Sequence, residues 1–335
     1  MPTPSFQKDR LLTACIVILS VAGILYFGIR AVMDQMHTDR KNPYEYDLGV
    51  FEQGAADAAT YSQVQSIPVR AEKLTGLTRG GDGFLYVSGD ENISKFDNNG
   101  NLVETFPIGG TAYCLALDAQ NRIYLGMGDH VEVYDEKGSL IAQWESLGPD
   151  AIITSIAVAD SIVYLADAGQ LLVWKFTTSG SLLGTIGKKN RTKGIPGYVI
   201  PSPYFDVAVG VDGTLWAANT GRHSLENYTH TGGLKSSWGE YGTAIDEFCG
   251  CCNPSHFAIL EDGGFVTSEK GIPRVKIYDR QGQFVAVVAA PSQFRVGTVG
   301  LDLVVDAAGR IYVLDPVQKG VRVFSKIEAT QEGAE

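Results

Sequence analysis

The sequence predicts an all-β protein, a six-bladed β-propeller preceded by a single transmembrane helix, and three observations support this prediction. A phrase of short apolar runs and turn residues recurs six times between residues 61 and 326. Glycine is enriched, with 39 residues among 335, as expected for a fold made of short strands and tight turns. An uncharged run of 19 residues, 11–29, precedes the repeats.

The uncharged run has the length of a membrane-spanning helix. At 1.5 Å per residue it spans a hydrocarbon core of about 30 Å. Lys8, Asp9 and Arg10 precede it and Arg30 follows it, and no small-x-small cleavage site comes after it. We therefore expect an uncleaved signal anchor over residues 11–30, after a short N-terminal segment at residues 1–10.

The charge distribution favours a propeller outside the cytoplasm, in the periplasm or on the cell surface. Basic residues close to the membrane stand on both sides of the run, and their count slightly favours a cytoplasmic body. However, only three of the 38 acidic residues precede residue 42, and an acidic, cysteine-bearing body after one N-terminal anchor is typical of extracytoplasmic proteins. The net charge of −11 also argues against nucleic-acid binding, which requires a basic surface.

A stalk or linker is expected between the anchor and the repeats, over residues 31–60. This stretch has no sustained helical or alternating pattern, and Pro43 prevents continuation of the membrane helix.

The six copies of the repeated phrase define the predicted blades. Each copy has an apolar run, a turn with Asp or Gly, and a short strand with an aromatic residue, and further short strands follow most copies. Successive copies begin 38–51 residues apart, and four short strands in that length form one propeller blade. The copies begin at Leu77, Leu115, Ile156, Val207, Phe257 and Leu303.

The sixth copy is incomplete, which predicts how the ring closes. It ends after its third strand, at residues 321–325, and a polar tail, residues 327–335, follows. Residues 61–69 (YSQVQSIPV) read as the missing outer strand, and their pairing with the last blade would remove the exposed sheet edges at the seam. The propeller is therefore predicted over residues 61–326.

The fourth and fifth copies resemble NHL repeats. Their segments PYFDVAVGVDGTLWAANTG and HFAILEDGGFVTSEKGIPRVKIYDRQG contain the inner strand, the D-G or similar turn and the F/Y-D-x-x-G turn of that family. The resemblance implies a six-bladed propeller that binds proteins or ligands on its faces, but it implies no particular reaction. The chain departs from the family signature at residues 219–225 and 269–275.

A cysteine-rich insertion interrupts the repeat before the fifth inner strand. Cys249, Cys251 and Cys252 are three thiols within four residues. The fourth cysteine after the anchor, Cys114, stands at a repeat position two residues before the central small residue of the inner strand. Equivalent positions lie at one height around the axis of a propeller, so Cys114 of blade two should face His256 of blade five, beneath the insertion. The six residues at this position are Gly76, Cys114, Ser155, Asp206, His256 and Asp302.

Three states of these thiols are compatible with the sequence. Cysteine thiolates and a neutral imidazole are ligands for zinc, copper or an iron–sulfur cluster, with Asp206 and Asp302 orienting the ligands or balancing charge. The predicted ligands are Cys249, Cys251, Cys252, Cys114 and His256. Alternatively, disulfides from Cys249 to Cys252 and from Cys251 to Cys114 would staple the insertion. The thiols could also be free or redox-active.

Three classes of function follow from these features. The first is a membrane-anchored binding or scaffold subunit that holds a protein partner within a membrane-associated assembly. The second is a metal or iron–sulfur electron-transfer protein that uses the Cys/His group. The third is a metal-dependent hydrolase or lyase like the gluconolactonase-type propellers, with Asp206, His256 and Asp302 near an axial Ca²⁺ or Zn²⁺. No catalytic residue is assigned, because no catalytic motif is present.

Overall fold

The computed structural model describes residues 13–14, 17–30, 33, 48–192, 195–295 and 297–327, and it divides into two units, residues 1–47 and 48–335. In the first unit, residues 17–30 are helical with exposed apolar side chains. Within the described residues, no helix is both long enough and apolar enough to cross a membrane. The predicted N-terminal segment, parts of the predicted anchor, most of residues 31–47 and residues 328–335 lie outside the described part.

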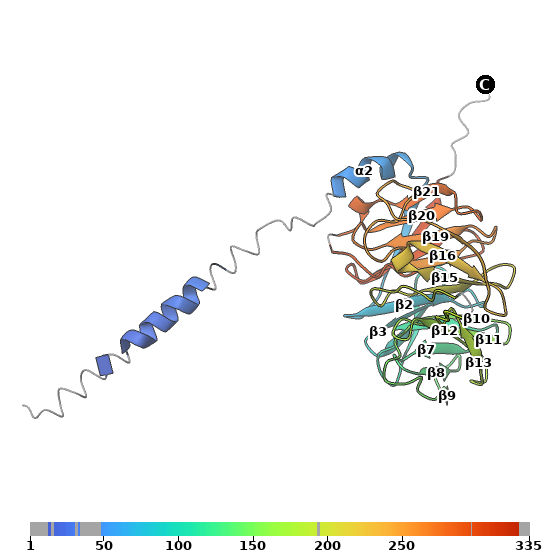
Figure 1. Cartoon of the computed structure of the whole chain (residues 1–335), viewed down its shortest axis with the longest axis horizontal. Helices are drawn as coiled ribbons and strands as arrows, with labels where there is room; N and C mark the ends of the chain where they lie inside the picture. Colours follow the sequence, from blue (N-terminus) through green and yellow to red (C-terminus); the bar gives the residue numbers. More distant parts are fainter. Residues whose placement is uncertain are drawn as a thin grey trace, which may run out of the picture. The chain divides into compact units, whose positions relative to one another are not determined.

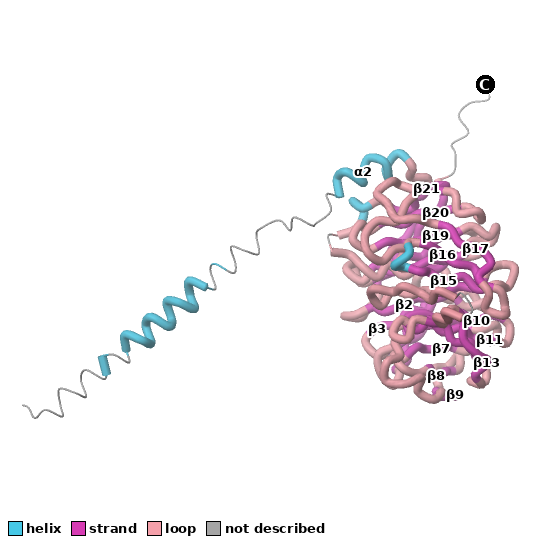
Figure 2. The backbone as a smooth tube through the Cα atoms, viewed as in Figure 1, coloured by secondary structure: helices cyan, strands magenta, loops and turns pink. Residues whose placement is uncertain are grey.

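The described residues of the second unit form six four-stranded antiparallel sheets, which confirms the predicted six-bladed propeller (Figures 1 and 2). Blades one to three are β2 (Leu74–Arg79), β3 (Leu85–Gly89), β4 (Asn92–Phe96) and β5 (Leu102–Pro107); β6 (Cys114–Leu117), β7 (Ile123–Gly126), β8 (Val131–Tyr134) and β9 (Leu140–Gln143); and β10 (Ile153–Ala159), β11 (Ile162–Asp167), β12 (Leu172–Thr177) and β13 (Leu182–Ile186). Blades four to six are β14 (Val207–Val209), β15 (Leu215–Asn219), β16 (Ser224–Tyr228) and β17 (Leu234–Trp238); β18 (His256–Ile259), β19 (Phe265–Glu269), β20 (Arg274–Tyr278) and β21 (Phe284–Ala289); and β22 (Leu303–Val305), β23 (Ile311–Asp315), β24 (Gly320–Lys326) and β1 (Tyr61–Pro68).

The ring closes through β1, as the incomplete sixth repeat predicts. This strand pairs antiparallel with β24, from Tyr61 opposite Lys326 to Pro68 opposite Gly320. The first strand of the propeller in the chain is therefore hydrogen-bonded to the last, and no blade is left with three strands.

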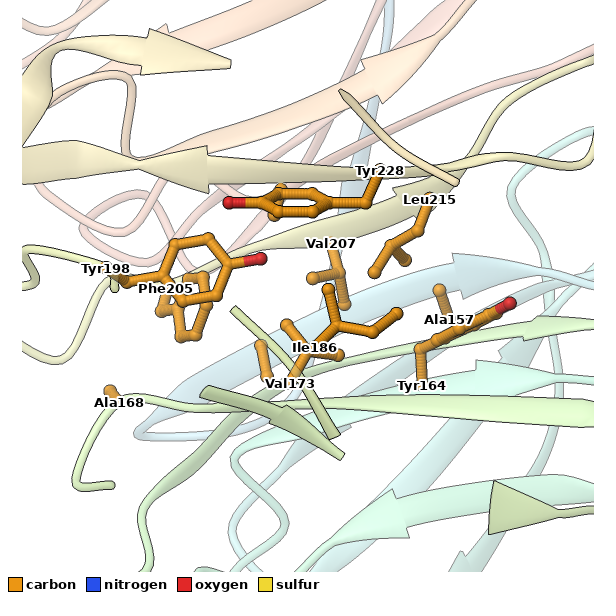
Figure 3. Packing of buried hydrophobic residues seen from close by; sticks show 12 residues of the cluster. Ala157, Tyr164, Ala168, Val173, Ile186, Tyr198, Phe205, Val207, Leu215 and Tyr228 are labelled. Carbon is orange, nitrogen blue, oxygen red and sulfur yellow. The ribbon is translucent and has the colours of Figure 1, made fainter. Parts of the chain in front are cut away.

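The core lies between neighbouring blades. One cluster joins blades three and four, where Tyr198 packs on Phe205 and Tyr228, with ring centroids 4.6 and 5.7 Å apart (Figure 3). The recurring aromatic residue of the repeat is also a packing residue, since Tyr86, Tyr124 and Tyr164 are at most 2% exposed on the second strands of blades one to three. Aromatic residues at this position bury a large apolar area between sheets.

Part of the expected stalk is instead ordered against the propeller. Residues 48–57 form helix α2 (Leu48–Asp57), which contacts β21 and the 3₁₀ helix η2 (Pro291–Gln293) (Figure 1). Ala55 is fully buried, and the carboxylate of Glu52 accepts a 2.9 Å hydrogen bond from the Ser292 amide. A helix of ten residues has too few turns for an apolar stripe to be recognised in the sequence. A helix this short is stabilised mainly by packing, here against blade five.

The two ends of the propeller carry different loops. Because strands alternate in direction, the loops that enter each innermost strand and the loops between second and third strands share one end, here termed the entry face. The entry-face loops that lead into innermost strands are residues 69–73, 108–113, 144–152, 187–206, 239–255 and 290–302. The cysteine-rich insertion is therefore on the entry face.

Candidate functional site

A central cavity of about 320 Å³ opens where the innermost strands converge. The repeat position singled out in the sequence lies at its wall in five of the six blades. The side chains that line it from this position are Cys114, Ser155, Asp206, His256 and Asp302. At Gly76 the neighbours Thr75 and Leu77 line the cavity instead.

Asp206 links three blades through its carboxylate. Its Oδ1 accepts hydrogen bonds from the Val207 amide at 2.9 Å and from the Ser155 hydroxyl at 2.5 Å. Its Oδ2 accepts a 2.8 Å bond from the Phe257 amide on the next blade. Because amide donors of innermost strands are satisfied in this way, Asp206 has a structural role at the axis whatever the cavity binds.

Asp302 repeats this arrangement at the seam between blades six and one. Its Oδ2 accepts a hydrogen bond from the Leu77 amide at 3.0 Å, and its Oδ1 accepts one from Leu303 at 2.8 Å. Each carboxylate thus ties its own inner strand to the inner strand of the following blade, from four to five and from six to one.

His256 lies between the two carboxylates without a direct hydrogen bond to either. Its Nδ1 is 3.9 Å from Asp206 Oδ2 and 3.7 Å from Asp302 Oδ1. Burial raises the pKa of Asp302 to about 6; the charge of His256 opposes this rise, and the charge of Asp206 adds to it. Burial also raises the pKa of Asp206. Both carboxylates at the cavity wall therefore hold a proton to higher pH than an ordinary aspartate does.

Cys114 contributes a neutral thiol to this wall. Burial, followed by the charge of Asp302, raises its pKa far above the ordinary value for cysteine, and its Sγ lies 4.0 Å from the Ile153 carbonyl oxygen. A thiol held in this state is not a nucleophile at neutral pH.

The insertion places its last two cysteines side by side. Cys251 is exposed and Cys252 is fully buried, yet their Sγ atoms are only 2.8 Å apart, and we refer to these two residues as the vicinal pair. Asn253 pins the loop by exchanging two 2.9 Å hydrogen bonds with the backbone of Lys270. Gly250, with φ of +87°, makes the turn into the pair, where a side chain would be strained.

Lys270 connects the vicinal pair with the cavity. Its Nζ donates a 2.9 Å hydrogen bond to the Ser202 hydroxyl and lies 4.6 Å from the ring centroid of Tyr204. Tyr204 in turn stacks edge-on against His256, with centroids 5.8 Å apart. Sequence reasoning missed Ser202, Tyr204 and Lys270, although the departure from the repeat signature at residues 269–275 was a visible signal.

Cys249 belongs to a different environment. It is 2% exposed, and its backbone amide donates a 3.4 Å hydrogen bond to Glu269. Glu269 is the centre of a buried charge cluster with Arg274 at 2.7 Å and Lys276 at 2.8 Å.

The predicted metal group is consequently not gathered in one place. Cys114 and His256 line the cavity, the backbone amide of Cys249 contacts Glu269 of the buried charge cluster, and the vicinal pair lies beside Lys270. All four cysteines of the propeller are free thiols, so neither predicted disulfide is formed. Across the described ranges, no group of three or more His, Cys, Asp or Glu side chains is arranged to hold a metal ion.

Exposed apolar side chains are concentrated on the entry face. Apart from the outer strands, which carry such residues all around the rim, seven large exposed apolar residues of the described propeller loops lie on this face. They are Tyr113, Ile152, Leu171, Val199, Tyr241, Val299 and Val317. On the opposite face the equivalent residues outside the strands, within the described part of the chain, are Val211 and Ile327.

Comparison with known proteins supports the propeller fold and indicates no particular function. No protein-family model matches the chain, and no curated protein matches its sequence. Virginiamycin B lyase from Staphylococcus aureus superposes with a TM-score of 0.57 at 11% identity, over 80% of this chain and all of that one. A streptogramin B lyase gives 0.56 at 13% identity, over 80% and 98%.

A further solved structure with a propeller of another kind is also similar. The WD40 β-propeller domain of Doa1 superposes with a TM-score of 0.53 at 17% identity, over 76% of this chain and 79% of that domain. Enzymes and a WD40 domain share the architecture, so these likenesses establish a propeller and leave its activity open.

Proposed function

We propose that this chain is a membrane-anchored binding or scaffold subunit, held outside the cytoplasm, whose entry face binds another protein of a membrane-associated assembly. One observation carries the proposal: seven exposed apolar side chains occupy the described entry-face loops, against two outside the strands at the opposite face. An apolar surface of this kind around a rim of polar loops is typical of protein interaction sites.

The composition of the surface supports a protein partner. Tyr113 and Tyr241 are 50% and 64% exposed, and aromatic residues of this kind are enriched where proteins bind one another. The net charge of −11 argues against a nucleic-acid ligand for the same face.

The anchor is part of the proposal and has its own test. The uncharged run at residues 11–29 supports it, and the exposed apolar side chains of helical residues 17–30 suit a lipid environment. The full chain should resist carbonate extraction from membranes and dissolve in detergent. A protease added to intact cells or spheroplasts should digest the propeller. Carbonate-soluble protein, or a propeller protected from the protease, would contradict the anchor or its orientation.

The binding test compares two triple variants with matched exposure. The variant Tyr113→Asp, Val199→Asp, Tyr241→Asp alters the entry face, and Leu102→Asp, Leu140→Asp, Leu182→Asp alters the outer strands, where the leucines are 51–56% exposed. Both are expressed in the native host and cross-linked in intact membranes.

The entry-face variant should lose the cross-linked partner, and the outer-strand variant should retain it. Equal retention by both variants, with melting temperatures matching the unaltered protein, would refute the assignment of the entry face.

We do not extend the proposal to a metal or cluster cofactor. The metal-carrying alternative stays a prediction from the sequence, because its cysteines and His256 have separate surroundings. The metal-dependent catalytic alternative also stays a prediction, with Asp206, His256 and Asp302 together at the cavity wall. Elemental analysis of the purified full chain tests them directly.

A further inference from the structure

The vicinal pair, Cys251 and Cys252, has no role in the proposed binding function. The Sγ atoms of these adjacent cysteines are 2.8 Å apart, which is closer than the van der Waals contact distance of two sulfur atoms. Neither cysteine is engaged in a disulfide. We infer that Cys251 and Cys252 form a redox site that exchanges with a disulfide of another molecule and closes into a reversible vicinal disulfide.

The two sulfurs are placed for different steps. Cys251 is exposed, so an incoming disulfide can reach it, whereas Cys252 is fully buried with its sulfur 2.8 Å from that of Cys251. Cys251 is thus the attacking thiol and Cys252 the resolving thiol.

The surroundings of Cys252 favour its thiolate. Burial alone would raise the pKa of Cys252, but hydrogen bonds from Cys251 and Ser202 and the ammonium of Lys270 hold it below the ordinary value. The same hydrogen bond to Cys252 raises the pKa of Cys251. Lys270 is fixed at this position by its bond to Ser202 and by the two backbone bonds to Asn253.

The chemistry balances without a resident cofactor. The Cys251 thiol passes its proton to the Cys252 thiolate 2.8 Å away, and the Cys251 sulfur attacks one sulfur of the external disulfide. That S–S bond breaks, and the external thiolate that leaves takes the proton from Cys252 and departs as a thiol. The Cys252 thiolate then attacks the Cys251 sulfur, forming the vicinal S–S bond and releasing the second external sulfur as a thiolate, which water protonates. The pair, which starts as one thiol and one thiolate, loses two electrons and one proton, and the external disulfide gains them.

Adjacency makes the product easy to reverse. Neighbouring Cα atoms are about 3.8 Å apart across a trans peptide, whereas protein disulfides usually join Cα atoms about 4.4–6.8 Å apart. A vicinal disulfide is therefore strained, and strained or exposed disulfides are the readily reduced, regulatory or catalytic ones. A structural staple would use cysteines farther apart in the chain.

The test treats the reduced full chain, in detergent, with oxidised glutathione and maps thiols by alkylation and mass spectrometry. The unaltered protein should form the Cys251–Cys252 disulfide with little persistent glutathione adduct. Cys252→Ser should accumulate one glutathione on Cys251, and Cys251→Ser should react at least about tenfold more slowly. Cys249→Ser and Cys114→Ser are the matched controls, because both thiols are buried, and both should behave like the unaltered protein.

A second variant tests the cation separately from the thiols. Lys270→Met preserves the backbone bonds to Asn253 and removes the charge, so the mixed disulfide on Cys251 should persist up to about tenfold longer. Resolution at the unaltered rate would overturn the role of Lys270.

Three results would overturn the redox site itself: Cys251 and Cys252 remaining reduced, a disulfide to Cys249 instead, or equal reactivity of Cys251→Ser and Cys252→Ser. Stoichiometric zinc in the isolated protein that blocks oxidation and is lost in Cys252→Ser would also overturn it, in favour of a metal site. None of these readouts depends on the entry-face partner, so the inference and the proposed function can fail independently.

Discussion

Two carboxylates at the axis, the buried Asp206 and the partly buried Asp302, show how single residues serve the fold and the cavity together. Asp206 and Asp302 accept amide hydrogen bonds from inner strands of neighbouring blades, which ties the blades at their narrowest point. Their burial has a cost, since an ionised carboxylate is poorly solvated there. His256 offsets part of this cost for both.

The raised pKa of Asp302 predicts a specific pH dependence of stability. With a pKa of about 6 in the fold and 3.8 ordinarily, Asp302 binds more protons folded than unfolded between these values. Its contribution to the free energy of unfolding is therefore fully present below about pH 4 and falls as the pH rises through 6. Asp302→Asn should flatten this slope and stabilise the protein at pH 7 by roughly 1–3 kcal/mol relative to its effect at pH 4.

Thermal unfolding of both proteins at several pH values between 4 and 7 measures this effect. Asp212→Asn is the control: its pKa is lowered to about 2 by the hydrogen bond from Lys235, so its contribution varies below pH 4. A parallel pH profile for Asp302→Asn and the unaltered protein would refute the assigned pKa.

Residue positions on the inner strands were predictable, and side-chain directions in the insertion were not. Cys114, His256 and the two aspartates occupy equivalent repeat positions, and equivalent positions on a ring of similar blades reach one cavity. The insertion has no repeat to align with. Its conformation depends on Gly250 and on Asn253, which bonds the Cys249 carbonyl and the backbone of Lys270, and none of these contacts belongs to the repeat.

At the scale of elements, a buried charge cluster fixes the loop that leads to the insertion. Lys276 on β20 is fully buried, and its Nζ donates hydrogen bonds to the carbonyls of Ile245 at 3.1 Å and Glu247 at 2.8 Å as well as bonding Glu269. Burial lowers the pKa of Lys276 to about 8, and the charge of Glu269 limits the fall. One lysine thus holds an entry-face loop against the third strand of its blade.

We predict that Lys276→Met destabilises the protein by about 2–4 kcal/mol, because it leaves the Ile245 carbonyl unpaired and reduces the compensation of buried Glu269. The Glu247 carbonyl keeps its hydrogen bond from Arg274. Lys235→Met is the matched control, since Lys235 pairs with Asp212 at 2.8 Å while both side chains are 50% exposed. Its effect should stay within about 0.5 kcal/mol. Urea denaturation measures both, and equal losses would show that the buried cluster adds no more than a surface pair.

Helix α2 could not be predicted from the sequence, unlike the strands of the propeller. The strands recur in six copies, so each copy supports the assignment of the others. The helix occurs once and spans ten residues, and its burial depends on Val287 and Ala290, far along the chain. A pattern without repetition and with distant partners is invisible in the sequence alone.

For the whole molecule, ring closure by β1 should decide whether the propeller is stable. The strand buries Ile67 to 2% exposure, and Val69 just after it is 6% exposed; each contributes about 1.5–3 kcal/mol by leaving water. Pairing also covers the edge of β24 from Gly320 to Lys326, which would otherwise be open to other strands. Together these terms approach the entire stability of an ordinary domain, about 5–15 kcal/mol.

Three shortened chains separate the contributions. A chain of residues 48–335 keeps α2 and β1 and should melt within a few degrees of the full protein. A chain of residues 61–335 loses α2, which buries Ala55, together with residues 58–60, which bond Val287, and should melt measurably lower. A chain of residues 70–335 loses β1 and should unfold or aggregate at room temperature, as followed by circular dichroism and size-exclusion chromatography. If the last chain melted like the second, the outer strand would be dispensable, and stability would reside in the contacts between blades rather than in the closed ring.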